Sequence, residues 1–280
     1  MREFHGRGRN HPGGGPRRET PERENRATPA GNDRDLVYGA EPIRELIAAA
    51  PAAIRVLYVK LGIERRFAGE LAAVRAGGGR VELLDDAAIA RVAGDTARHQ
   101  GIAALMRPYE YAQLEDFLRD QPDPIVVVDG VTDPRNLGAL MRSAEGAGAK
   151  AVVIARDRTA AITPAAIKAS AGAWIHLKIA QCGNVARTLE QFKAAGYWIA
   201  ALAPGGETSL YDLDVSRKLV LVVGSEDRGV REIVRKKADF LVGIPMRGRV
   251  ASLNVSVAAA VALFEIARRR ALFEARQTEP

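Results

Sequence analysis

Five short apolar runs in the second half of the chain constrain its fold more than any other feature. Each run is almost continuously apolar, which is typical of strands buried on both faces, because strands with one wet face alternate apolar and polar residues. Segments with helical spacing separate the runs and begin near Asn136, Thr163, Asn184 and Val230. The runs are IVVVD (125–129), KAVVIA (150–155), GYWIAAL (196–202), KLVLVV (218–223) and DFLVGIP (239–245). This alternation predicts an α/β fold with a parallel sheet covered by helices on both sides.

The remainder of the chain divides at changes in composition. Residues 1–34 are rich in Gly, Pro, Arg and Glu and poor in large apolar side chains, so they bury too little surface to offset the entropy of ordering. We expect a disordered tail there. Strand-like and helical segments alternate over 35–106 and predict a small α/β module, followed by a linker and connecting helix over 107–123. The larger α/β domain is expected over 124–280.

The charge balance favours a polyanionic partner such as nucleic acid. The chain has 41 Lys and Arg against 34 Asp and Glu, which gives a formal net charge of +7 and a pI near 9.7. Three of these net positive charges lie in residues 1–32, so the folded part is only mildly basic. The tail is either a solvated segment or an arm that binds nucleic acid, and its sequence is compatible with both.

Several classes of protein are disfavoured by what the sequence lacks. No apolar stretch approaches the roughly 18 residues that cross a bilayer, and the N-terminus lacks the apolar core of about 7 to 15 residues of a secretory signal. The single cysteine, Cys182, cannot form an intrachain disulfide, and no Cys/His cluster has the spacing of a zinc site. We therefore expect a cytoplasmic protein with neither a metal site nor a membrane association.

Two loops after the apolar runs carry polar residues where parallel sheets bind ligands, at the carboxyl ends of strands. In DGVTDPRNLGALMRSAEGAG, Asn136 could cap a helix and Arg142 could pair with the glutamate three residues later, or both could serve a site. In LVVGSEDRGV, Gly224 lets a ligand approach the backbone, and Glu226 lies at the mouth of the loop. Neither loop has the glycine pattern of nucleoside triphosphate or dinucleotide sites.

A third loop, IPMRGRVASLNVSVAAAVALFE, joins the last apolar run to the closing helix. It carries two arginines, Arg247 and Arg249, and either Ser252 or Asn254 could cap the helix. Arginines beside a polar helix start favour a phosphate-rich substrate.

In this order and spacing, the three loops resemble the signature motifs of the SpoU (TrmH) family of RNA ribose 2′-O-methyltransferases. DPRNLGALMRSAEGAGA resembles the first motif, LVVGSEDRGV the second and IPMRGRVASLNVSVAAAVALFE the third, so the resemblance spans about residues 124–270. Upstream, LVYGAEPIRELI and RHQGIAALM resemble the small N-terminal RNA-binding domain of the branch that methylates a guanosine of 23S ribosomal RNA.

This resemblance implies a fold, a donor and partners. The family sheet contains a deep trefoil knot, its members are typically homodimers, and the methyl donor is S-adenosylmethionine. The N-terminal module implies large-subunit ribosomal RNA as substrate, because shorter relatives that methylate transfer RNA lack it. Transfer RNA remains an alternative substrate. A second alternative is a non-catalytic RNA-binding factor in ribosome assembly.

The resemblance also assigns roles to single residues. The expected catalytic residues are Asn136, Arg142, Glu226, Ser252 and Asn254. The family holds the donor largely through backbone groups, which places Leu202, Gly224, Ile244, Met246 and Leu253 around it. We expect Arg247 and Arg249 to contact RNA phosphates. A guanidinium is effectively always protonated, so we interpret Arg142 as stabilising charge on the reacting oxygen or gripping a phosphate, with Asn136 and Glu226 holding it.

Overall fold

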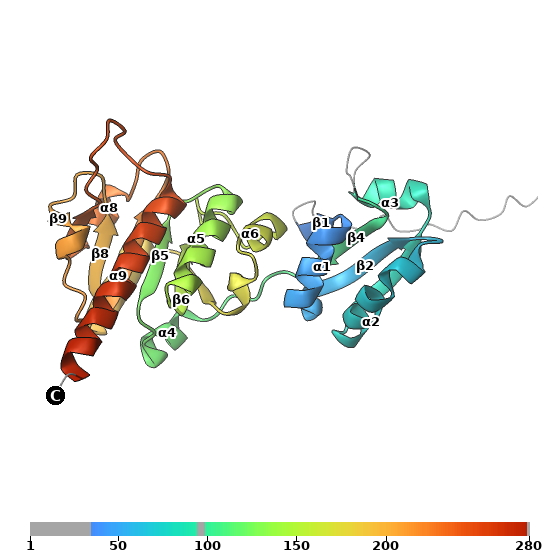
Figure 1. The fold of residues 1–280 in the computed structure, drawn as a ribbon, viewed down its shortest axis with the longest axis horizontal. Coiled ribbons are helices and arrows are strands. Elements are labelled where there is room, and N and C mark those ends of the chain that lie inside the picture. The colour runs from blue at the N-terminus through green and yellow to red at the C-terminus, as the bar shows by residue number, and fades with distance from the viewer. Residues whose placement is uncertain (1–34, 94–98, 279–280) are drawn as a thin grey trace, which may run out of the picture. The chain divides into compact units, whose positions relative to one another are not determined.

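A computed structural model gives the three-dimensional structure of the chain and describes residues 35–93 and 99–278 (Figure 1). The tail for which the sequence predicts disorder, residues 1–34, lies outside the described residues. Within the described ranges, no helix combines the length and apolar character needed to cross a membrane.

Residues 35–106 form a four-stranded mixed sheet with the strand order β1-β4-β2-β3. Strand β4 pairs antiparallel with β1 and β2, while β2 and β3 are parallel. Buried residues of α1 and α2, such as Ile43 and Val74, pack on one face, and Ala93 of α3 packs on the other. The elements are β1 (Leu36–Tyr38), α1 (Ala40–Ala49), β2 (Ile54–Lys60), α2 (Ala68–Ala76), β3 (Arg80–Leu84), α3 (Asp86–Ala93) and β4 (Ile102–Met106), with 3₁₀ turns at Pro51–Ala53 and Glu64–Phe67.

The second sheet has seven strands in the order β7-β6-β5-β10-β8-β11-β9, and all of its pairings are parallel. Its strands are β5 (Ile125–Asp129), β6 (Ala151–Ala155), β7 (Lys178–Cys182), β8 (Trp198–Leu202), β9 (Thr208–Ser209), β10 (Leu219–Gly224) and β11 (Phe240–Gly243). Its helices are α4 (Leu114–Asp120), α5 (Pro134–Gly146), α6 (Pro164–Ala169), α7 (Val185–Ala194), α8 (Glu232–Arg235) and α9 (Val255–Thr278), with 3₁₀ turns at Ala173–Ile175 and Leu210–Asp212. The predicted parallel α/β fold is confirmed.

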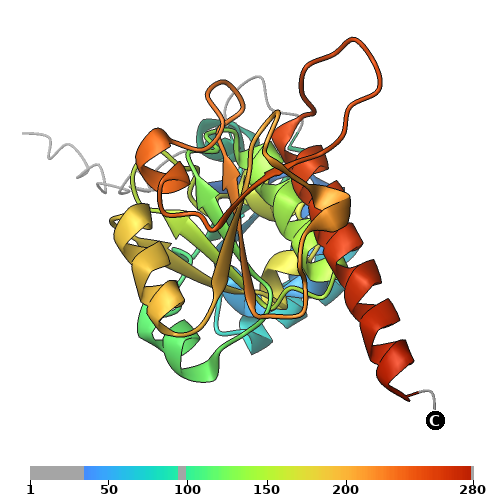
Figure 2. The same ribbon diagram turned by 90° about the vertical axis from the view of Figure 1, so that its left-hand side faces the viewer.

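Helices cover both faces of this sheet (Figure 2), and an apolar core lies under each layer. Alternate residues of β5 point to opposite faces: Val126 and Val128 join the core under α5 and α9, while Ile125 and Val127 join the core under α4 and α7. Every residue of β5, β6 and β10 is buried, which explains why the sequence of these strands is continuously apolar. The two cores cover the faces of the sheet, so its loops lie at the ends of the strands.

The register of the sheet brings three loops together at the carboxyl ends of the strands. Asp129, the last residue of β5, lies beside Gly224, the last residue of β10. On the other side of β10, Leu202 at the end of β8 lies beside Val242 of β11. Helix α9 begins near these loops and runs back across the sheet against α5 (Figure 1). The loops after β5, β10 and β11 are those that the sequence singles out.

Candidate functional site

A chain of hydrogen bonds joins the three loops. The Nδ2 amide of Asn136, after β5, donates to Glu226 Oε1 at 2.8 Å, after β10. The Nδ2 amide of Asn254, before α9, donates to Asn136 Oδ1 at 3.1 Å. Asn254 Oδ1 then accepts from the backbone N–H and the hydroxyl of Ser256 at 2.9 and 2.7 Å. The structure therefore brings three of the five expected catalytic residues into direct contact across 118 positions of sequence.

The capping of helix α5 differs from one sequence prediction. Asn136 does not cap the helix: Asp133 is the N-cap, and its carboxylate accepts from the N–H of Arg135 at 2.8 Å. Pro134 occupies the first helical position, where a missing N–H costs nothing. With the cap supplied by Asp133, the amide of Asn136 is available to bind Glu226 and Asn254.

Helix α9 is capped by Asn254, one of the two residues that the sequence offers for this position. Its Oδ1 accepts from the N–H groups of Ser256 and Val257. Ser252 is exposed and forms no hydrogen bond within the described part of the chain, but it lines the pocket described below. Asn254 thus serves both the helix and the site, whereas Ser252 is free to meet a ligand.

Arg142 lies apart from the hydrogen-bonded chain. It follows Asn136 by six residues on α5, which is about 9 Å along the helix axis. Its side chain is exposed and forms neither a hydrogen bond nor an ion pair with the described residues, so the alternative pairing with Glu145 is absent. The expectation that Asn136 and Glu226 hold Arg142 is wrong for this structure, because neither residue forms a hydrogen bond or ion pair with it and they bind each other instead.

A pocket of about 290 Å³ opens beside Glu226 at the carboxyl ends of β8, β10 and β11. All five residues expected around the donor line it: Leu202, Gly224, Ile244, Met246 and Leu253. The turn Ser225–Gly229 supplies one wall, and Ser252 lies at the opposite loop. A Cβ atom on Gly224 would overlap the backbone of Gly229 and Val230, so only glycine permits this turn to fold back so tightly.

Arg247 and Arg249 lie in the loop between β11 and α9, next to the pocket but outside its lining. Both are exposed, and neither forms a hydrogen bond or ion pair within residues 35–93 and 99–278. Their positive charges are therefore available to an anionic ligand that reaches this edge of the sheet.

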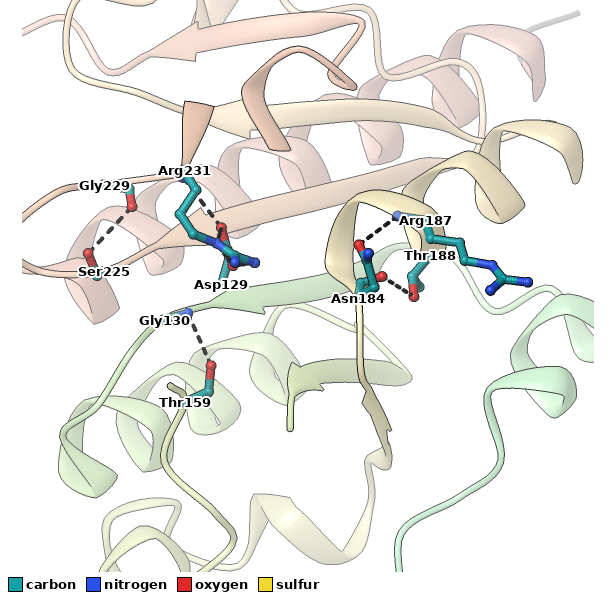
Figure 3. A network of polar contacts seen from close by, with 9 residues as sticks. All are labelled: Asp129, Gly130, Thr159, Asn184, Arg187, Thr188, Ser225, Gly229 and Arg231. Atoms are coloured by element: carbon teal, nitrogen blue, oxygen red, sulfur yellow. Dashed lines mark hydrogen bonds and ion pairs between the residues drawn. The ribbon is translucent and has the colours of Figure 1, made fainter. Parts of the chain in front are cut away.

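One feature that the sequence does not identify is an ion pair beneath the pocket, between Asp129 and Arg231 (Figure 3). The hydrogen bond to the Asp129 carboxylate raises the pKa of the Arg231 guanidinium. Nearby, burial raises the pKa of the Cys182 thiol, which makes this lone cysteine a poor nucleophile. The only sequence signal for the pair was a charged residue at the end of an apolar strand.

Chemically, the site combines an apolar pocket with a polar rim. The pocket offers aliphatic side chains and turn backbone, which suit a ligand without phosphate groups. The rim offers amides, a carboxylate, a hydroxyl and exposed arginines, which suit a hydroxyl-bearing polyanion. Within the described residues, no group of three or more His, Cys, Asp and Glu side chains is arranged to hold a metal ion.

The sequence matches two families that are consistent with this geometry. Residues 123–264 match the SpoU rRNA Methylase family, and residues 36–112 match the RNA 2′-O ribose methyltransferase substrate binding family. The first match contains Asn136, Glu226 and Asn254, and the second covers the four-stranded sheet.

Individual relatives support the same relationship. A protein of Mycobacterium avium named as a tRNA/rRNA methyltransferase is 38% identical over 267 residues, which cover 93% of this chain and 85% of the relative. A protein of Staphylococcus haemolyticus that is named as a TrmH family tRNA/rRNA methyltransferase is 40% identical over 179 residues, which cover 62% of this chain and 72% of the relative. An AdoMet-bound rRNA methyltransferase from Sinorhizobium meliloti superimposes with a TM-score of 0.69 at 25% identity, over 84% of this chain and 87% of that chain.

Proposed function

The chain belongs to the SpoU rRNA methylase family, and from this premise we propose that it methylates a ribose 2′-hydroxyl of large-subunit ribosomal RNA, at a guanosine. It is an RNA 2′-O-ribose methyltransferase whose methyl donor is S-adenosylmethionine. The choice of ribosomal over transfer RNA, and of guanosine over other nucleosides, is the part that we propose.

The observation that carries the proposal is the hydrogen-bonded chain of Glu226, Asn136 and Asn254 at the rim of the pocket. These residues come from three loops that the family treats as its motifs, and they meet where a donor in the pocket would face a substrate outside it. A fold that only bound RNA would not need this arrangement of amides and a carboxylate beside an apolar pocket.

The pocket residues fit the donor. S-adenosylmethionine supplies a methyl group already activated by its sulfonium, and it has no phosphates for a glycine-rich loop to bind. The wall is formed mainly by a tight turn and by aliphatic side chains, and Arg228 on that turn is the one cation among the residues that line the pocket. Leu202, Gly224, Ile244, Met246 and Leu253 would hold the donor by apolar contact and backbone hydrogen bonds.

The remaining residues would act on the RNA. A ribose hydroxyl is a weak nucleophile, so the enzyme must align its oxygen with the methyl group and stabilise the charge that develops on it. Arg142 is exposed, unpaired among the described residues and always protonated, so we assign it to that charge or to the adjacent phosphate. Asn136, Glu226, Ser252 and Asn254 would orient the ribose and the loops.

We assign RNA binding to two further parts of the chain. The module at residues 35–106 would select a structured ribosomal RNA, which is supported by its match to a substrate-binding family. Arg247 and Arg249 would contact phosphates that flank the reacting ribose. We further propose domain boundaries near residues 106 and 124 and a cytoplasmic location. We also propose that the chain forms a knot where it passes from β11 into α9, and an experimental structure would test this.

We also propose a homodimer, supported by a second apolar face on helix α9. Val255, Ala259 and Ile266 are buried against the sheet, while Val257 and Phe264 lie on the opposite side of the helix and are 47% and 52% exposed. An apolar face of this kind is a candidate for contact with a second copy. Sedimentation analysis of the native chain and of Phe264→Asp would test this: a dimer that the substitution dissociates is expected, and a monomeric native chain would contradict it.

Transfer of labelled methyl from S-adenosylmethionine tests the proposed function. Unmodified 23S ribosomal RNA and transfer RNA are offered separately, and the methylated ribose is then mapped. We expect label in ribosomal RNA at one guanosine. Label only in transfer RNA would overturn the substrate assignment. RNA binding without label in either RNA would favour the ribosome-assembly alternative.

A further inference from the structure

Asp129 is the only charged side chain that is buried among the described residues, with 1% of its surface exposed. Buried carboxylates persist only where they are paired. Its partner is Arg231, whose Nε donates to both carboxylate oxygens at 2.8 and 3.0 Å (Figure 3). The backbone N–H of Arg231 also donates to Asp129 Oδ2, at 3.3 Å. One carboxylate thus binds both the side chain and the main chain of a residue 102 positions away.

The pair closes the base of the loop that walls the pocket. Strand β10 ends at Gly224, which lies beside Asp129 in the sheet, and the loop returns to Asp129 at Arg231. Between them, Ser225 and Gly229 exchange two backbone hydrogen bonds of 3.0 Å and close a tight turn. That turn carries Glu226 and lines the pocket over five consecutive residues. The tight turn is therefore a compact unit, and the residue two positions after it, Arg231, is bound to Asp129 at the end of β5.

Asp129 is also the point from which the loop with Asn136 departs. Gly130, the next residue, has φ +96 and turns the chain away from the strand. Its N–H donates to Thr159 Oγ1 at 3.1 Å (Figure 3). The carbonyl oxygen of Val131 accepts from the N–H of Ala160 at 2.8 Å. Both loops that meet in the Asn136–Glu226 hydrogen bond are consequently anchored at one residue.

The Asp129 side chain is buried while that of Arg231 is 38% exposed, and such a pair is a weak source of stability, because desolvation of the carboxylate offsets much of the attraction. Its larger effect is geometric, since the guanidinium Nε–H and the backbone N–H of one residue fix a carboxylate in direction as well as distance. In metal sites, removing a residue that holds a ligand in place commonly weakens binding by about 10- to 100-fold. We use that range as a guide for this pocket.

We propose that Asp129 and Arg231 are positioning residues for the methyl donor: their ion pair sets the turn Ser225–Gly229 at the height where its backbone lines the donor pocket. The inference rests on the proposed function, because it takes this pocket as the donor site. It assigns a role to two residues that touch neither donor nor RNA.

The test is donor affinity measured by calorimetry on the full chain with S-adenosylmethionine alone. Arg231→Gln removes the charge, and Arg231→Lys keeps the charge but loses the planar fork. We expect the dissociation constant to rise by about 10-fold or more in Arg231→Gln and by a smaller factor in Arg231→Lys. The single-turnover rate at saturating donor is expected to fall less than the affinity does.

A matched control exists at the other end of the same sheet. Asp239 also binds one backbone N–H, that of Ile199 at 2.8 Å, and one cation, Lys193 at 2.6 Å. Lys193→Gln breaks this pair far from the pocket. It is expected to lower Tm while leaving the dissociation constant of the donor within twofold of the native value.

The outcomes separate the two proposals. If the native chain does not bind S-adenosylmethionine, the assignment of the pocket is wrong. If the native chain binds it and Arg231→Gln binds equally well, the positioning role is wrong, as it also is if donor affinity merely follows Tm across Arg231→Gln and Lys193→Gln. Should Arg231→Gln fail to fold, Arg231→Lys decides: affinity equal to that of the native chain would refute the proposal, and weakened binding at unchanged Tm would support it.

Discussion

The two ends of the seven-stranded sheet use their charged residues differently. At the amino end, Asp123 accepts from the N–H of Leu219 at 2.9 Å and from Arg270 at 3.0 Å. At the carboxyl end, Arg247 and Arg249 in the β11–α9 loop are exposed and form no ion pair within the described ranges. The charges at the amino end contact the protein itself, whereas the carboxyl end has both an internal ion pair, Asp129–Arg231, and arginines that are available to a ligand. We therefore expect substitutions at the amino end to change stability and substitutions of the exposed arginines to change methyl transfer or RNA binding.

The largest effect is expected from Arg142→Ala on α5. If Arg142 stabilises charge on the reacting oxygen, the single-turnover rate of methyl transfer should fall by about 100-fold or more, since loss of one such donor costs 100- to 1,000-fold in other enzymes. Donor affinity and Tm should be unchanged, because the exposed side chain forms no hydrogen bond or ion pair with the described residues. Rapid-quench measurement with bound donor and RNA gives the rate.

Arg187→Ala is the matched control for Arg142. Arg187 lies on α7, and its backbone N–H, rather than its side chain, binds Asn184 (Figure 3). Its exposed guanidinium is on the face of the sheet away from α5. Near-native turnover in Arg142→Ala, or an equal loss in Arg187→Ala, would contradict the role given to Arg142.

At the amino end, Arg270→Gln should change stability and not chemistry. Arg270 binds Asp123 and the carbonyl oxygens of Val215 and Arg217, so it ties α9 to the strands. Loss of these bonds, one of them to a charged group that is 27% exposed, should cost about 1 to 3 kcal/mol and lower Tm by roughly 2 to 10 °C. The methyl-transfer rate at 25 °C should stay at the native value.

Arg268→Gln gives the comparison for this prediction. Arg268 lies two residues earlier on α9 and pairs with Glu265 at 2.7 Å within the same helix. A pair three residues apart on one helix contributes only about 0.2 to 0.5 kcal/mol and does not connect α9 to the sheet, so thermal unfolding should occur near the native Tm. A shift as large as that of Arg270→Gln would mean that position on α9, rather than contact with the sheet, determines the effect.

An intermediate effect is expected where structure and chemistry share one residue, Asn254. Asn254→Asp keeps the oxygen that caps α9 but removes the amide that donates to Asn136, so Tm should hold while the rate falls by about 10-fold. Asn254→Ala removes both and should in addition cost about 1 kcal/mol of stability. Equal rates for Asn254→Asp and the native chain, measured at saturating donor, would remove Asn254 from the site.

Much of the sheet could be predicted from sequence because burial on both faces leaves continuous apolar runs. Strands β1, β7 and β9 were missed for physical reasons. Strands β1 and β9 have three and two residues, too few for a pattern, and β7 lies at the edge of the sheet, where Lys178 and Gln181 interrupt its apolar character. Edge strands need not be apolar on both faces, so the sequence signal weakens there.

The candidate site was predictable where a motif fixes the local chain, and less so where contacts are long-range. Glu226 and Gly224 lie where the loop after an apolar run indicates. Of the two alternatives that the sequence left open for Asn136, the helix cap is wrong, because Asp133 followed by proline caps α5. The pairing of Asp129 with Arg231 spans 102 residues, and no local pattern encodes it.

The smallest effect concerns the two exposed arginines beside the pocket. If Arg247 and Arg249 each neutralise one RNA phosphate, replacing both with alanine should reduce the slope of log affinity against log salt by about 1.4 to 1.8, because each phosphate contact contributes roughly 0.7 to 0.9. Arg187→Ala combined with Lys193→Ala removes the same charge from α7, away from the pocket, and should leave the slope unchanged. Equal slopes for all three proteins would mean that these arginines remain in solvent when RNA binds. An equal reduction of the salt slope in both double variants would mean that net charge attracts the RNA, without specific phosphate contacts at the carboxyl end of the sheet.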